Sequence, residues 1–236
     1  MSNSNVKAKI YVFGAKPKQA LLVPEIPIAV RNNCQSGQWV IGDTDYGSKI
    51  SMTIIKFSKF FGNLGQTINT LWGQIWFVAE SGELPHGVLM VTYIKGRSLN
   101  DFNRLIASVQ SQGVEPATGI FLPEFIKHSG QKPDENGVVK PINYYSLKWR
   151  WQERTDWSII QQAAAVLSDK NNLSRMIDLE GTRKMVCLDN LSAEETASLM
   201  VAHTNSDRNY SLLGSNISND TALPQENESL AAAISS

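Results

Sequence analysis

The stretch YYSLKWRWQER, residues 144–154, combines four aromatic rings with three basic side chains. Aromatic rings can stack on planar groups, and Lys and Arg side chains attract phosphate or carboxylate groups. This segment is therefore either part of a buried core or a surface that contacts a flat, negatively charged ligand.

The alternation expected of a β-strand allows both roles, because neighbouring side chains then point to opposite faces. One face is apolar and aromatic and carries Tyr145, Leu147, Trp149 and Trp151. The other face is polar and basic and carries Tyr144, Ser146, Lys148, Arg150, Gln152 and Arg154. We expect the apolar face to fill a core and the basic face to meet solvent or a ligand.

Other segments can extend such a surface. Basic residues occur at the ends of further predicted strands, namely Lys56, Lys59, Lys95 and Arg97. Three rings are candidate stacking platforms, namely Trp76, Tyr93 and Tyr144. A base stacked on an exposed ring contributes about 1–3 kcal/mol without reading sequence. Burial in the core is the alternative for each ring, since large aromatic side chains are mostly buried.

Catalytic and metal-binding patterns are not found in the sequence. The three histidines lie in unrelated segments, without an acid or cysteine at metal-ligand spacing. Asp43 and Asp45 fall in a polar turn, and FGNLGQ lacks the spacing of a phosphate-binding loop. No nucleophile, base and acid can be assembled into a catalytic set. We therefore expect no enzyme activity, no metal and no cofactor.

The elements that must position these residues are predicted from periodicity. Strand-like alternation or apolar runs cover residues 48–60, 71–80, 87–96, 119–130 and 143–154. Residues 97–113 have helical spacing, with Ser98 as a predicted N-cap and Asp101 in the first turn. The order strand, strand, strand, helix, strand, strand predicts a mainly β protein with a five-stranded OB-like barrel. Other α+β folds with a five-stranded sheet and one helix remain open.

The predicted domain organisation has four parts. Residues 1–38 form an N-terminal arm or edge segment, and residues 39–154 form the OB-like β domain. Residues 155–203 form a helical region, in which Asp156 is a candidate cap and Ser192 with Glu195 matches a capping box. Residues 204–236, rich in Asn and Ser, are predicted to be a flexible tail.

Charge is distributed unevenly along the chain. Met1 to Arg154 holds 17 Lys and Arg and 11 Asp and Glu, a balance of +6, whereas the remainder holds 5 and 11, a balance of −6. A basic body with an acidic end is a hint of nucleic-acid contact. Ordinary solvated surface is the alternative and is equally compatible with so small an imbalance.

The sequence also bears on the compartment. No secretory signal is found, and no run approaches the roughly 18–20 apolar residues that cross a bilayer. Cys34 and Cys187 show no disulfide or zinc spacing. We expect a soluble, cytoplasmic protein.

The strand order and the interleaved bases and rings of KISMTIIKF, VTYIKGR and YYSLKWRWQER resemble the OB-fold single-stranded-DNA-binding proteins of phages and plasmids. The resemblance covers about residues 39–154 and implies strand protection, with oligomerisation common. The end of the chain, SLAAAISS, differs from the acidic tail of the bacterial proteins of this class.

Two functions remain as expectations. The first is non-catalytic binding of single-stranded nucleic acid through a basic, aromatic-bearing β surface. The second is a structural or assembly role in a phage or mobile element, through protein–protein contacts, since exposed aromatic residues also form interfaces. Both allow a homo-oligomer and protein partners for the C-terminal region, and neither involves a membrane.

Overall fold

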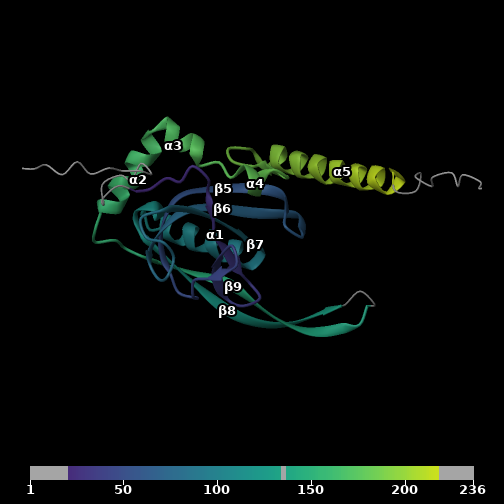
Figure 1. The fold of residues 1–236 in the computed structure, drawn as a ribbon, viewed down its shortest axis with the longest axis horizontal. Helices are drawn as coiled ribbons and strands as arrows, with labels where there is room; N and C mark the ends of the chain where they lie inside the picture. Colours follow the sequence, from purple (N-terminus) through teal and green to yellow (C-terminus); the bar gives the residue numbers. More distant parts are fainter. Residues whose placement is uncertain (1–20, 134–136, 218–236) are drawn as a thin grey trace, which may run out of the picture. The chain divides into compact units, whose positions relative to one another are not determined.

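The computed structural model describes residues 21–133 and 137–217 and divides the chain into two compact units, Met1–Asn190 and Leu191–Ser236. In its described residues the first unit is mainly β-sheet with few helices, as the alternating sequence pattern predicts (Figure 1). The second unit contains the helix α5, Ala193–Ile217.

The first unit is built on one large sheet and one small sheet. The large sheet has the order β1-β7-β6-β5-β8-β9, and β10 pairs with the other end of β5. Its strands are β1 Ile28–Ala29, β5 Ser51–Leu64, β6 Thr67–Ser81, β7 Leu89–Lys95, β8 Ile120–Pro133, β9 Val139–Gln152 and β10 Met185–Cys187. The small sheet contains β2 Arg31–Asn33, β3 Gln38–Ile41 and β4 Thr44–Asp45.

Three strands, a helix and two strands follow one another as β5, β6, β7, α1, β8 and β9, where α1 spans Gly96–Gln110. In the described residues the large sheet also includes β1 and β10, so the expected five-stranded sheet is not found. The expected closed barrel is not formed. Closure would join the β1–β7 side of the large sheet to the free edge of β9, and within the described residues the sheet stays open between them.

The free edge of β9 is satisfied by other groups. The N–H of Leu147 donates to Ser98 Oγ at 2.9 Å, and the N–H of Trp149 donates to Asp101 Oδ2 at 2.8 Å. The N–H of Tyr145 donates to the carbonyl oxygen of Cys34, in the turn after β2, at 2.7 Å. Ser98 is therefore not the N-cap predicted from the sequence, because α1 begins at Gly96 and both side chains bond to β9 instead.

The small sheet connects the two sides of this gap. The Asn32 side chain on β2 donates to the carbonyl oxygen of Tyr93 on β7 at 2.7 Å. The turn after β2 also lies against β9, where a Cβ on Gly37 would come within 2.9 Å of the Tyr145 ring. The turn thus needs a glycine at this position, which also has a positive φ of 73°.

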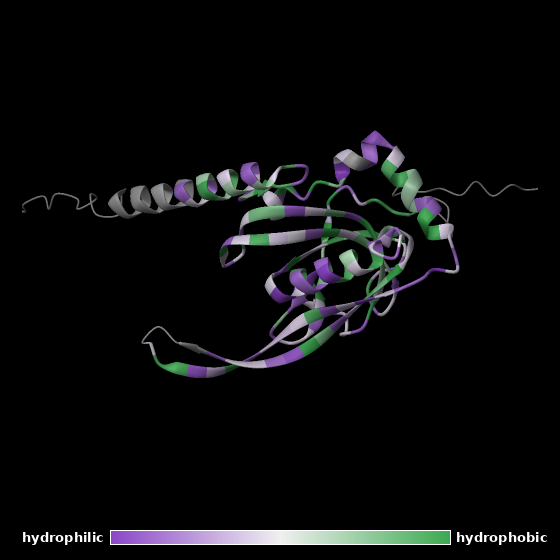
Figure 2. Ribbon diagram, turned by 180° about the vertical axis from the view of Figure 1, so that it is seen from behind, coloured by the Kyte–Doolittle hydropathy of each residue, from purple (hydrophilic) through white to green (hydrophobic). Residues whose placement is uncertain are grey.

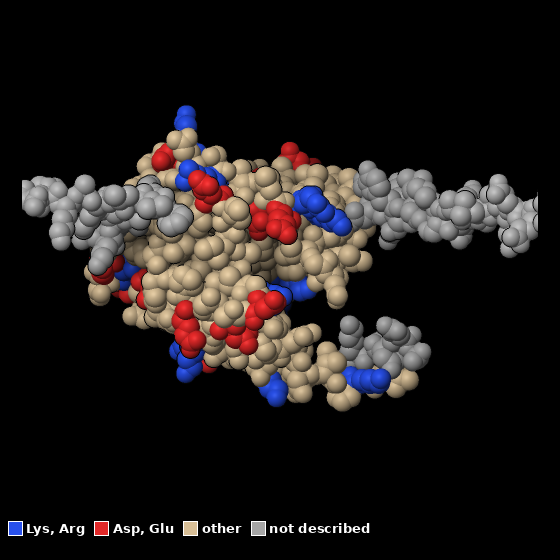
Figure 3. Space-filling model, in the orientation of Figure 1, with Lys and Arg blue, Asp and Glu red and all other residues tan. Residues whose placement is uncertain are grey.

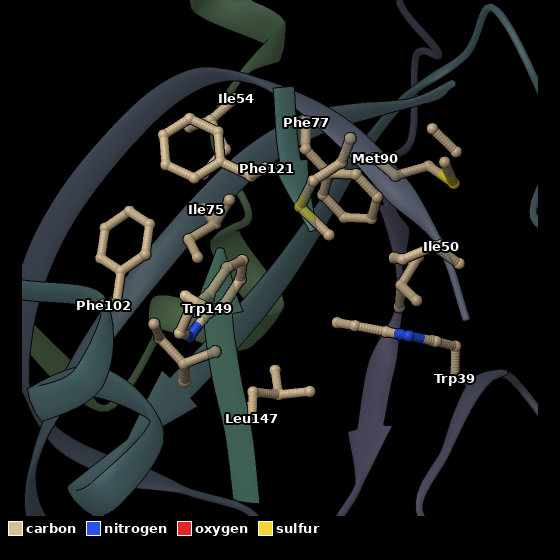
Figure 4. Close-up of a cluster of buried hydrophobic side chains, with 14 of the residues drawn as sticks. Trp39, Ile50, Ile54, Ile75, Phe77, Met90, Phe102, Phe121, Leu147 and Trp149 are labelled. Atoms are coloured by element: carbon tan, nitrogen blue, oxygen red, sulfur yellow. The ribbon is translucent and has the colours of Figure 1, made fainter. Parts of the chain in front are cut away.

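The main core lies between the inner face of the large sheet and α1 (Figure 4). Phe102 of α1 is at its centre, with ring centroids 5.0 Å from Phe57, 5.8 Å from Phe121 and 5.0 Å from Trp149. Leu147 and Trp149 are buried here, and Trp151 packs against the cluster. The predicted inward direction of these three β9 residues is confirmed.

A second layer covers the outer face of β5, β6 and β7. It consists of residues 21–23 with the helices α2 Ser158–Ser168, α3 Lys170–Arg175 and α4 Leu179–Thr182. Val166 and Met176 from this layer pack against the strand residues Trp76, Val78, Leu89 and Val91. Three helices follow residue 155 within this unit, and the sheet is buried on both faces here.

The ends of the chain differ in part from expectation. Residues 21–38 contribute β1, β2 and a bridge from Leu22 to Val88, so they form an edge segment of the fold. The capping box is confirmed, because the Glu195 side chain accepts from the N–H of Ser192 at 2.8 Å. The expected tail is wrong for residues 204–217, which continue α5, while residues 1–20 and 218–236 lie outside the described residues.

Replacing Asp101 with Ala should destabilise the protein by about 1–3 kcal/mol, because the Trp149 N–H loses its acceptor in a partly buried place. Urea unfolding measures this difference. The control is Asn100→Ala, on the exposed side of the same helix turn, for which we expect a change within about 0.5 kcal/mol. Equal effects of the two substitutions would contradict a special role for Asp101.

Asp156 lies just before α2, whose N-cap is Trp157, and its carboxylate accepts from the N–H of Ser158 at 2.9 Å and from the Ser158 hydroxyl at 3.0 Å. These bonds lower the pKa of Asp156. The stabilisation is then present above the unfolded pKa of about 3.9 and is lost as pH falls through the lower folded pKa. The loss of stability between neutral and acid pH should be smaller in Asp156→Asn, as measured by urea unfolding at each pH. An identical pH dependence in both proteins would show that the bonds between Asp156 and Ser158 contribute nothing to stability.

Candidate nucleic-acid interface

On the outer face of β8 and β9, exposed cations of the predicted basic surface lie together on one strand. On β9 the side chains of Lys148, Arg150 and Gln152 are exposed, whereas their neighbours Leu147 and Trp149 are buried. This alternation follows directly from the strand's period of two. One face of β9 is therefore buried in the core and the other is exposed to solvent, as the sequence predicts.

One carboxylate interrupts the basic face. The register of β8 with β9 places Glu124 opposite Lys148, and the Glu124 carboxylate lies 3.5 Å from the Arg150 guanidinium. Both side chains of this ion pair are more than half exposed, so it contributes little to stability. Arg150 can therefore exchange this partner for a phosphate at small cost.

Aromatic rings lie next to these cations. Tyr144 is opposite His128 in the register, and their rings are 5.1 Å apart with an interplanar angle of 30°. The His128 Nε2 is 2.8 Å from Ser146 Oγ, which holds the imidazole on the outer face. Sequence reasoning did not find His128, because only the pairing of β8 with β9 places it beside Tyr144.

Lys140 continues the same face toward the β8–β9 connection and is exposed. It lies four residues before Tyr144, on the same side of the strand. Figure 3 shows Lys and Arg side chains spaced along the margin of the molecule that β8 and β9 form. Lys140 has an even number, as Lys148 and Arg150 do, so alternation places it on the same face. The sequence analysis missed it because the predicted strand began at residue 143, whereas β9 begins at Val139.

Two of the predicted stacking rings are not available. Trp76 is only 1% exposed and its Nε1–H donates to Gln74 Oε1 at 2.9 Å. The Tyr93 hydroxyl accepts from Gln74 and donates to Asp178, and burial raises the pKa of Tyr93. The expectation that these rings are exposed is wrong, because residues 21–23 and 156–190 cover this face of the sheet.

Arg154 was expected to face a ligand and is instead buried, with 6% of its surface exposed. Its guanidinium pairs with the Glu80 carboxylate and with Thr53 Oγ1. This ion pair ties the chain after β9 to β5 and β6. β9 ends at Gln152, and the chain beyond it carries the Arg154 guanidinium onto Glu80 and Thr53, where it is buried.

The remaining predicted cations are exposed but lie elsewhere: Lys56, Lys59, Lys95 and Arg97. Lys59 is opposite Gly73 and Lys56 is opposite Trp76, so the two lysines belong to opposite faces of β5. Lys95 lies 5.0 Å from the centre of the Trp72 ring, a cation–π contact. The structure thus divides the predicted site into a β9 group and scattered residues on β5, β7 and α1.

The burial of Arg154 is tested by Arg154→Met, which leaves the Glu80 carboxylate without its cation. We expect a loss of about 3 kcal/mol, the low end for a buried pair, because Glu80 keeps 18% side-chain exposure. Arg150→Met, which breaks the exposed pair with Glu124, should cost at most about 1 kcal/mol. Chemical denaturation compares the two variants, and a larger loss for Arg150→Met would overturn this assignment.

No described helix is long and apolar enough to cross a membrane. Over the described ranges, no group of three or more His, Cys, Asp or Glu side chains could hold a metal ion.

Comparison of the chain with protein-family models, with curated proteins and with solved structures found no match. The candidate interface is therefore defined by geometry alone. It consists of the outer face of β8 and β9, with Tyr144, Lys148 and Arg150 from the predicted set and His128 and Lys140 added by the structure.

Proposed function

We propose that this protein binds single-stranded nucleic acid, without catalysis, through the outer face of β8 and β9. The observation that carries the proposal is the alternation on β9, which exposes Lys148 and Arg150 while Leu147 and Trp149 hold the strand in the core. A cationic strand face anchored in this way can follow a phosphate backbone without rearrangement of the fold.

The composition of the hairpin supports an anionic ligand. Residues 120–152 contain five Lys or Arg (Lys127, Lys132, Lys140, Lys148 and Arg150) and three Asp or Glu (Glu124, Asp134 and Glu135), a balance of +2. The half-buried Tyr144 and His128 rings supply an aromatic surface between the cations. Charge and rings together are the features that sequence-tolerant single-strand binders combine.

The succession of elements supports a relation to the OB fold, which is a five-stranded and partly open barrel. OB folds bind oligonucleotides on the face of their second and third strands and on the loops between strands 1 and 2 and between strands 4 and 5. Here the strands in the second and third places are β6 and β7, and their outer face is covered by α2, α3 and α4. The uncovered alternative is the hairpin of the fourth and fifth places, β8 and β9.

The variant Lys148→Ala/Arg150→Ala tests the proposal. It should weaken binding of a labelled single-stranded DNA, measured by fluorescence anisotropy over a range of salt concentrations. Because each neutralised phosphate contributes about 0.7 to the log–log salt slope for a single strand, we expect the slope to fall by roughly 1.4. Thermal unfolding should be nearly unchanged, since both side chains are exposed.

A matched control removes the same charge elsewhere. Lys170→Ala/Lys184→Ala takes two exposed lysines from the second layer and from the segment before β10. This variant should bind as the unaltered protein does. Failure of the unaltered protein to bind any single strand at low salt would refute the proposal.

An assembly role through protein contacts is not favoured by the exposed apolar residues. The three most exposed are Ile26, Ile68 and Leu179, which lie in three separate segments. Single exposed apolar side chains are ordinary on protein surfaces.

A further inference from the structure

The far half of the β8–β9 hairpin projects beyond the sheet as a two-stranded ribbon. From the pair Lys127 and Tyr145 to the pair Pro133 and Val139, β8 and β9 pair only with each other in the part of the chain that the structure describes. These seven pairs, which we call the β8–β9 arm (residues 127–133 and 139–145), span about 20 Å at roughly 3.4 Å per residue. Figures 1 and 2 show the arm extending toward the same end of the unit as the turn between β5 and β6.

Prolines block both edges of the arm. The N–H of Tyr145 points away from β8, toward Cys34, so odd-numbered residues of β9 turn their N–H groups to the free edge. Pro141 occupies such a position and offers no donor there. On β8 the same reasoning places Pro133, opposite Val139, on the outer edge. Prolines at these positions prevent the addition of another strand, so a partner must contact the faces of the arm.

Both faces of the arm carry positive charge, and the turn after β2 covers the inner face only where it meets Tyr145 at the base of the arm. Lys127 is exposed on the inner face and Lys140 on the outer face. Near the tip, Val138 and Val139 are each 56% exposed. No Asp or Glu lies within the ribbon itself, although Asp134 and Glu135 follow it in the connection, outside the described residues. An isolated two-stranded hairpin is only marginally stable in water, so a ligand that encloses both faces would stabilise the arm.

We propose that the β8–β9 arm enters the major groove of a DNA duplex, so that the preferred ligand is a junction between single- and double-stranded DNA. The major groove of B-form DNA is about 12 Å wide and admits a two-stranded β-ribbon. Lysines on both faces of such a ribbon meet the phosphates of both groove walls. Lys140 and Tyr144 on the arm share one strand face with Lys148 and Arg150 on the domain, so a single ligand can span both.

This inference rests on the proposed function, which supplies the binding of the single-stranded part of the junction. It adds a second contact, between the arm and the duplex part. It also sets a preference for DNA. The major groove of A-form RNA is deep and narrow and does not admit side chains, so an RNA junction should gain nothing over an RNA single strand.

The experiment compares the full chain on three labelled DNA probes. They are a single strand, a blunt duplex of roughly two helical turns, or about 20 base pairs, and the same duplex with a single-stranded overhang. The junction should bind more tightly than either simpler probe. Each phosphate contact contributes close to tenfold at about 0.1 M salt, since log K falls by about 0.9 per decade of salt for each neutralised duplex phosphate.

The variant Lys127→Ala/Lys140→Ala tests whether the arm is responsible. It should lower the affinity for the junction toward that for the single strand and reduce the junction salt slope by about 1.8. The loss on the single strand should be smaller, because of the two lysines only Lys140 belongs to the single-strand face and Lys148 and Arg150 remain, so the single-strand salt slope should fall by only about 0.7. The control Lys170→Ala/Lys184→Ala removes an equal charge and should leave the junction preference intact.

Three results would overturn the inference, and each has its own meaning. Equal binding of single strand and junction removes the duplex site but leaves the proposed function standing. A junction preference that survives in Lys127→Ala/Lys140→Ala assigns the duplex contact to another surface. Concentration-dependent dimerisation in sedimentation, lost on Val138→Lys/Val139→Lys, would assign the arm to a second copy of the chain. Absence of all DNA binding would instead refute the proposed function itself.

Discussion

The free edge of β9 is the constraint on which the rest of the structure depends. Three of its outward N–H groups, at residues 145, 147 and 149, are bonded to Cys34, Ser98 and Asp101 rather than to a neighbouring strand. A buried donor without an acceptor costs about 1–3 kcal/mol, so this edge must be paired or capped. Because α1 and the turn after β2 provide the caps, the sheet is stable without closing into a barrel.

The capping of β9 also determines which surfaces of the sheet are exposed to solvent. Capping fixes β9 from Tyr145 to Trp149 against the core, and the strand continues past this anchor into the arm. The outer face of the sheet is divided accordingly. Its β5–β7 half is covered by the second layer, which is fixed by the Arg154–Glu80 pair and by the hydrogen bond of Tyr93 with Asp178. The β8–β9 half stays in solvent and carries the cations.

The ligand-binding role proposed for β8 and β9 uses the part of the outer face that the second layer leaves uncovered. Aromatic rings that a single-strand binder of OB type would expose pack here against the second layer, and Trp76 is the largest of them. The aromatic surface that remains is the ring pair of Tyr144 and His128, set between Lys140 and Lys148. Proline at positions 133 and 141 protects the arm from strand addition while leaving its faces free.

The sequence by itself determined the succession of strands and helix and the two faces of β9, because periods of 2 and 3.6 residues are properties of the local backbone. It also determined the capping box of Ser192. Only the tertiary structure decided that Ser98 bonds β9 rather than its own helix, that Trp76 and Arg154 are buried, and that His128 adjoins Tyr144. These outcomes depend on contacts between segments far apart in the chain, which no local periodicity encodes.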